Sequence, residues 1–141
     1  MLLGGLVAST YSGLICVDFP TCNGEYFPAM QGPIALQMLH RWGAYLLVLM
    51  VATLFVKTRR AYRNHNVLQS QYLSVLFAFC LVCCQVVVGI MNLKFFLPAW
   101  LTVIHSALAI LLFTQVFKAY LESVRFGSQG SDFEMTVHRQ F

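Results

Sequence analysis

The chain has 141 residues, of which 59% are hydrophobic and only 10% are charged, with a formal net charge of +4. Soluble domains carry roughly a quarter charged residues, so this composition excludes an ordinary water-soluble globule. The excess of positive charge follows from membrane topology, and we therefore do not expect nucleic acid as a partner.

The apolar residues fall into blocks along the chain. Residues 1–8 are apolar but too short to span a bilayer, and they lack the basic start of a signal peptide. We interpret them as the end of a helix whose beginning is missing, in a chain that is part of a longer protein. The blocks at about 33–56, 71–94 and 98–121 are each long enough to span. Because a bilayer offers the backbone no water, they must be helices.

These blocks predict an all-α, polytopic membrane helix bundle with three full transmembrane helices after a truncated first one. Residues 1–125 form the membrane domain in this interpretation. Residues 126–141 are rich in Gly, Ser and Gln without helical periodicity, and we expect a flexible cytoplasmic tail there, with His138 solvated.

Positive charge is distributed unevenly between the connecting segments. The loop 57–70 holds four Lys or Arg residues, whereas the loop 9–32 holds none. By the positive-inside rule, the 57–70 loop and the C-terminus are cytoplasmic, and the 9–32 loop faces outward. We expect a multi-pass protein of the inner (plasma) membrane. Contact of the basic loop with anionic lipid is an alternative that gives the same topology.

Cys16 and Cys22 lie in this outer loop with five residues between them. An oxidising compartment favours a disulfide between cysteines at this spacing, as a brace for the loop or as a thiol-exchange site. Cys80, Cys83 and Cys84 lie inside the middle span, where we interpret them as small buried hydrophobic residues.

Two spans open with the same spacing: Pro33 precedes His40 as Pro98 precedes His105. Proline suits the first turn of a helix, so each histidine lies roughly 10 Å below its helix start. Both spans run inward, which places the two imidazoles at one depth. This arrangement predicts axial ligation of a heme iron, with a proton relay or a polar helix clasp as alternatives. Zinc is less favoured because it takes three or four protein ligands.

Small residues lie one turn below each histidine, Ala44 with Gly43 beside it and Ala109. They leave room for a flat macrocycle, although close helix packing also uses small residues. Arg41 is a candidate partner for a heme propionate; snorkelling to the headgroups is the alternative.

Together these residues resemble heme A synthase over most of the chain, from about Gly4 to Phe117. The resemblance rests on the following segments: Gly4-Gly5-Leu-Val-Ala-Ser-Thr-Tyr-Ser-Gly, the loop from Cys16 to Cys22, Leu39-His40-Arg41-Trp-Gly-Ala44, Gln85-Val-Val-Val-Gly89, and Leu97-Pro98 through His105 to Ala109. The family has eight membrane helices in two similar halves, each with a histidine pair. It oxidises a methyl group of heme O to the formyl group of heme A for cytochrome oxidase.

The resemblance implies that His40 and His105 are the axial pair of one half. The substrate half carries a glutamate three residues before its first histidine, where this chain has Gln37. We therefore expect the C-terminal half, which binds heme B for electron transfer, with no catalytic residue of its own and no activity alone. The family often has proline at the position of Val17, a departure that concerns the loop geometry.

The resemblance implies heme O, in the other half, as substrate. Heme O synthase, a quinone or another electron acceptor, membrane lipid and a second copy of the chain are further expected partners. A stand-alone cytochrome b-type electron carrier is the alternative function. A membrane thiol–disulfide oxidoreductase using Cys16 and Cys22 is less favoured, because such enzymes usually present an outer Cys-x-x-Cys.

Overall fold

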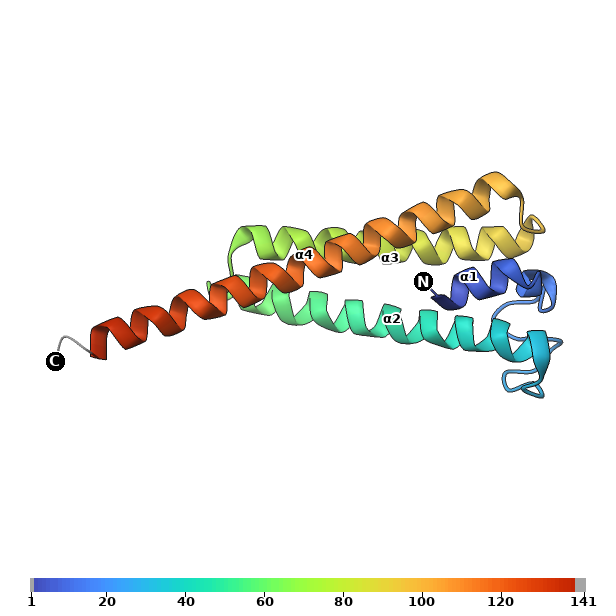
Figure 1. Ribbon diagram of the computed structural model, residues 1–141, viewed down its shortest axis with the longest axis horizontal. Helices are drawn as coiled ribbons and strands as arrows, with labels where there is room; N and C mark the ends of the chain where they lie inside the picture. Colours follow the sequence, from blue (N-terminus) through green and yellow to red (C-terminus); the bar gives the residue numbers. More distant parts are fainter. Residues whose placement is uncertain (1, 139–141) are drawn as a thin grey trace.

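The computed structural model describes residues 2–138, with side chains described through Arg125. Four α-helices follow one another: α1 (Leu2–Ser9), α2 (Gly32–Arg63), α3 (Gln69–Lys94) and α4 (Ala99–His138), with a short 3-10 turn, η1 (Ser12–Leu14), after α1. Figure 1 shows α2, α3 and α4 running lengthwise, with α1 beside them at the end where the loop between α1 and α2 lies. The predicted all-α membrane fold is confirmed.

The three long helices are apolar and long enough to cross a membrane. Most of their large apolar side chains face outward, among them Leu46, Leu49, Ile110 and Phe113. In water such a surface would aggregate, whereas lipid is its natural solvent. Composition, helix length and the direction of the apolar side chains therefore agree on a multi-pass membrane protein.

The helices extend beyond the apolar blocks. α2 continues to Arg63, so the basic residues of the predicted 57–70 loop lie on its last turns and the connection shrinks to residues 64–68. Cationic side chains favour a helix C-terminus, which explains why the helix outlasts the apolar stretch. At the start of α3, the Gln71 side chain accepts a hydrogen bond from the Leu68 amide at 3.1 Å.

The backbone of α4 is helical to His138, although the sequence beyond Arg125 shows no helical period. The side chains of that segment, and residues 139–141 entirely, lie outside the described part of the chain. Flexibility of the 126–141 tail and solvation of His138 therefore stay predictions.

Two clusters of buried residues hold the bundle together. Along the middle of the bundle α3 packs against both α2 and α4. The residues of this cluster are Val51, Ala78, Leu81, Val82 and Leu112. The second cluster, at the loop end, joins Cys16 and Cys22 to Met38 of α2. His40 lies between the two clusters along α2, and His105 lies about two turns before Leu112 of the first cluster on α4.

Candidate functional site

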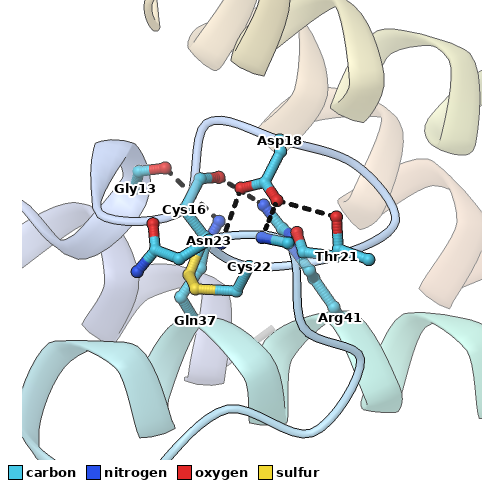
Figure 2. Close-up of a disulfide and its surroundings, with 9 residues drawn as sticks. Gly13, Cys16, Asp18, Thr21, Cys22, Asn23, Gln37 and Arg41 are labelled. Carbon is cyan, nitrogen blue, oxygen red and sulfur yellow. Dashed lines mark hydrogen bonds between the residues drawn. A yellow bond between two sulfur atoms is a disulfide. The ribbon is translucent and has the colours of Figure 1, made fainter.

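The loop between α1 and α2 folds around a pair of cysteines (Figure 2). Cys16 and Cys22 are joined as a disulfide and are fully buried, with 0% of their surface exposed. Ile34, Met38 and Trp42 of α2 pack against them. The disulfide therefore packs against α2 and is not exposed to solvent. This position is the one expected of a disulfide that braces the loop.

Asp18 organises the inside of this loop. Its carboxylate accepts hydrogen bonds from the Thr21 hydroxyl at 2.7 Å and from the backbone amides of Asn23 and Gly24 at 2.9 and 2.8 Å (Figure 2). These donors, the Gly24 amide above all and then the Thr21 hydroxyl, hold the pKa of Asp18 well below its usual range. The carboxylate is thus ionised at any physiological pH and fixes the loop through hydrogen bonds to its charged form.

Arg41 joins this loop to α2. Its guanidinium donates to the backbone carbonyl oxygens of Thr21, at 2.6 Å, and of Cys16, and only 5% of the residue is exposed. The Nε atom is buried without a hydrogen-bond partner among the described residues. The charge of Arg41 is therefore directed at the disulfide loop. Its predicted contact with a propionate stays a prediction.

Gly13 links the two helices that carry the histidines. Its carbonyl oxygen accepts a hydrogen bond from the buried Gln37 side chain of α2 at 3.3 Å. Its Cα lies so close to Leu97, just before α4, that a side chain at this position would collide with the leucine. Gln37 lies one turn before His40, and Leu97 lies two turns before His105. Both histidines therefore lie within roughly 10 Å of the loop end of the bundle.

Each histidine ring rests against a glycine of the preceding helix. A Cβ added to Gly4 of α1 would lie 3.4 Å from Cε1 of His40, and one added to Gly89 of α3 would lie 3.2 Å from Cε1 of His105. Both rings are half-buried. The pairs α1–α2 and α3–α4 thus repeat one arrangement, which extends the repeat of the two proline-to-histidine segments.

The His105 ring has a second neighbour on α3. Nε2 of the Gln85 side chain donates to the backbone carbonyl of His105 at 3.0 Å and lies 3.4 Å from its ring Nε2. Nδ1 of His105 is buried without a partner among the described residues. The sequence does not show which residue of α4 faces Gln85, so it does not predict this contact.

The chemistry of the donor set suits heme better than a bare metal ion. Among the side chains described, through Arg125, no three His, Cys, Asp or Glu residues are placed to hold a metal ion together. A porphyrin brings four ligands of its own and needs only two from the protein, so this pair fits heme iron and not zinc. Ala44 and Ala109 are half-buried one turn further along.

The cysteines of the middle span were expected to be buried, and that expectation is wrong. Cys80, Cys83 and Cys84 are all exposed on the outer surface of the bundle. Cysteine is apolar enough for a lipid-facing position, so periodicity within an apolar span could not distinguish the two faces of α3. These thiols lie outside the candidate site.

Comparison with known proteins places the chain in a family. Residues 1–117 match the COX15-CtaA family model, described as cytochrome oxidase assembly protein. The chain is similar to the heme A synthase of Paracoccus denitrificans, at 32% identity over 131 residues, which cover 84% of this chain and 33% of that protein. It is also similar to the heme A synthase of Neorickettsia sennetsu, at 33% identity over 127 residues, which cover 79% of this chain and 36% of that protein.

The chain therefore spans about a third of the length of the curated relatives it matches. The family model covers the loop with the two cysteines and the helices of both histidines. On this match the chain belongs to the COX15-CtaA family of cytochrome oxidase assembly proteins.

Proposed function

We propose that this chain holds a heme between His40 and His105, as the heme B-binding half of a heme A synthase. The proposal is supported above all by one packing arrangement that occurs at both imidazoles. Each rests on a glycine of the preceding helix at the same end of the bundle. A proton relay would need no such repeat, and a structural clasp would bring the two rings into a hydrogen bond with each other.

A heme held by both imidazoles would supply single-electron transfer and would have no free iron site for a substrate. The chain's own residues hold and shield it in this proposal. The two imidazoles supply the axial nitrogens, and Ala44 and Ala109 leave space beside them. The disulfide loop covers α2 next to His40 and keeps water from the outer end.

Gln37 supports assignment to the electron-transfer half. The substrate half of the family carries a glutamate at this position, whereas Gln37 is an amide whose Nε2 donates to Gly13 at 3.3 Å. An amide neither gives nor takes a proton at neutral pH, so Gln37 serves the packing of the loop on α2. Oxidation of the heme O methyl group to the formyl group of heme A then belongs to the companion half. Heme O, heme O synthase and a quinone or another electron acceptor are the partners this implies.

The same proposal assigns the sides of the membrane. The loop 9–32 and the turn before α4 lie at one end of the bundle, and the basic last turns of α2 lie at the other (Figure 1). Excess positive charge favours the cytoplasmic side, which puts the disulfide loop outside the inner membrane. That side is oxidising enough for the Cys16–Cys22 bridge.

Absorption spectroscopy tests heme binding directly. Protein purified from heme-replete cells is expected to show a low-spin, bis-histidine spectrum that His40→Ala or His105→Ala abolishes. His65→Ala is the matched control, because His65 is exposed in the connection between α2 and α3. A colourless wild-type protein, or a spectrum that survives both substitutions, would contradict the proposal.

A cytochrome b-type carrier would give the same spectrum, so the synthase assignment needs its own test. His105→Ala introduced into the native gene is expected to lower heme A in membrane extracts and to raise heme O. An unchanged ratio of heme A to heme O, despite loss of the bis-histidine spectrum, would favour the carrier.

A further inference from the structure

Gln85 gives His105 a contact that His40 lacks. Gln85 and Gly89 lie one turn apart on α3 and share a face. The glycine lets the His105 ring approach, and the Gln85 amide nitrogen reaches both the His105 carbonyl at 3.0 Å and its ring Nε2 at 3.4 Å. In the side chains described, through Arg125, none donates to the His40 ring.

These contacts determine where the proton of His105 resides. A carbonyl oxygen only accepts, so the atom of Gln85 that faces the His105 carbonyl must be its NH2 group. The same NH2 group faces ring Nε2, which can then only act as an acceptor. The hydrogen of the neutral imidazole is therefore on Nδ1, and the lone pair is on Nε2.

We propose that Gln85 is a positioning residue for iron ligation by His105. It favours the tautomer whose lone pair is on Nε2 and holds the ring at a fixed rotation on α4. The inference rests on the heme-binding function proposed above. The contact to ring Nε2 is the longer of the two and would be given up on iron ligation, while the shorter bond to the carbonyl would keep α4 in register with α3.

The unpartnered atoms support this role. Oε1 of Gln85 and Nδ1 of His105 are both buried without a hydrogen-bond partner among the described residues. A buried amide oxygen and ring nitrogen left unpaired each destabilise the protein. If Gln85 served packing alone, an apolar residue, or another orientation of the amide, would avoid this loss of stability. The presence of a glutamine at this position is explained by the contacts that its NH2 group makes with His105.

Gln71 offers a matched control on the same helix. It is buried in α3, and its Nε2 donates to a backbone carbonyl of α4, that of Glu122, at 3.2 Å. Gln71→Leu therefore removes an α3–α4 hydrogen bond far from either histidine, together with the bond that Gln71 accepts from the Leu68 amide. Gln85→Leu and Gln71→Leu should both lower the thermal unfolding midpoint, and only the former should alter the histidine site.

Heme titration of the purified chain is the first measurement. Gln85→Leu is expected to weaken heme affinity about tenfold, the usual effect of losing a group that orients a metal-binding histidine. It should also change the low-spin electron paramagnetic resonance signal, which reports the angle between the two imidazole planes. Gln71→Leu should leave both unchanged. If Gln85→Leu does not fold, Gln85→Met, which keeps the chain length and volume, decides.

Carbethoxylation of the heme-free protein separates this inference from the proposed function. Loss of the Gln85 contact should raise the modification rate of His105 about fivefold, which corresponds to about 1 kcal/mol, with the rate of His40 unchanged. If the wild-type protein binds no heme, the proposed function is contradicted. The carbethoxylation rate of His105 still tests whether Gln85 contacts its ring. Equal His105 rates and equal heme affinities in Gln85→Leu and wild type overturn the inference alone.

Discussion

The two histidines are held in different ways, although their helices repeat one arrangement. The helix around His40 is fixed by the loop between α1 and α2, through the disulfide on Met38 and the bonds of Gln37 and Arg41. His105 is fixed by its neighbouring helix, through Gly89 and Gln85. The first histidine therefore depends on a loop closed by a covalent bond, and the second on packing and a hydrogen bond between neighbouring helices.

Substitution of Arg41 should have the largest effect on stability, and this effect should arise in the region around His40. Arg41→Leu leaves the carbonyls of Thr21 and Cys16 without their charged donor, and we expect a loss of about 3 kcal/mol in the free energy of unfolding. Denaturant titration in detergent measures it. Arg59→Leu, an exposed position on the same helix, should change stability by less than about 0.5 kcal/mol. A comparable loss in both variants would show that the loop contacts are not what Arg41 contributes.

Opening the disulfide should have the next largest effect. The double variant Cys16→Ser/Cys22→Ser is expected to lose about 2 kcal/mol, because the unfolded chain is no longer restrained by the small ring. Carbethoxylation of the heme-free protein should become faster at His40 and stay unchanged at His105. Cys83→Ser, at an exposed thiol of α3, is the control. Faster modification of both histidines would mean that the loop fixes the whole bundle.

Alanine should affect stability differently at Gly4 and Gly89, the two glycines that the histidine rings contact. Gly89→Ala puts a Cβ 3.2 Å from the His105 ring, tighter than ordinary contact, and we expect a loss of about 1 kcal/mol. Gly4→Ala puts one at an ordinary 3.4 Å from the His40 ring, so alanine's better helix propensity should leave stability equal or slightly higher. Thermal unfolding midpoints of the two variants test the difference. If Gly4→Ala is destabilised and Gly89→Ala is unaffected, the expected difference between the two glycines is contradicted.

The sequence predicted those features that depend on local pattern. Block length and charge predicted the spans, and the proline-to-histidine spacing predicted the depth of His40 and His105. Hydropathy measures apolar length, however, and not helix length, so it missed the continuation of α2 through its basic last turns to Arg63.

The missed contacts share a physical cause. Arg41 binds the backbone carbonyls of Thr21 and Cys16, and every residue has such a carbonyl, so no side-chain pattern could reveal them. The ring that approaches Gly89 comes from another helix, so the pattern within α3 does not predict that contact. Asp18 could have been noticed, because an aspartate followed by Thr21, Asn23 and Gly24 is typical of a turn capped by its carboxylate.

The smallest effect concerns Asp18 and bears on the loop alone. Its pKa is depressed in the folded protein, so its contribution to stability is present above the ordinary carboxyl value and is lost as the pH falls through the folded value. The amides of Asn23 and Gly24 should therefore stay protected from hydrogen exchange until the pH falls below about 4, after correction for intrinsic rates. Asp18→Asn should remove this dependence, and Glu25→Gln, at an exposed residue of the same loop, should keep it. Protection of the backbone around His105 should not change over this range, because no bond to Asp18 reaches α3 or α4. Loss of protection there at the same pH would show that the loop and the helix pair are coupled, contrary to the difference between the two histidine regions.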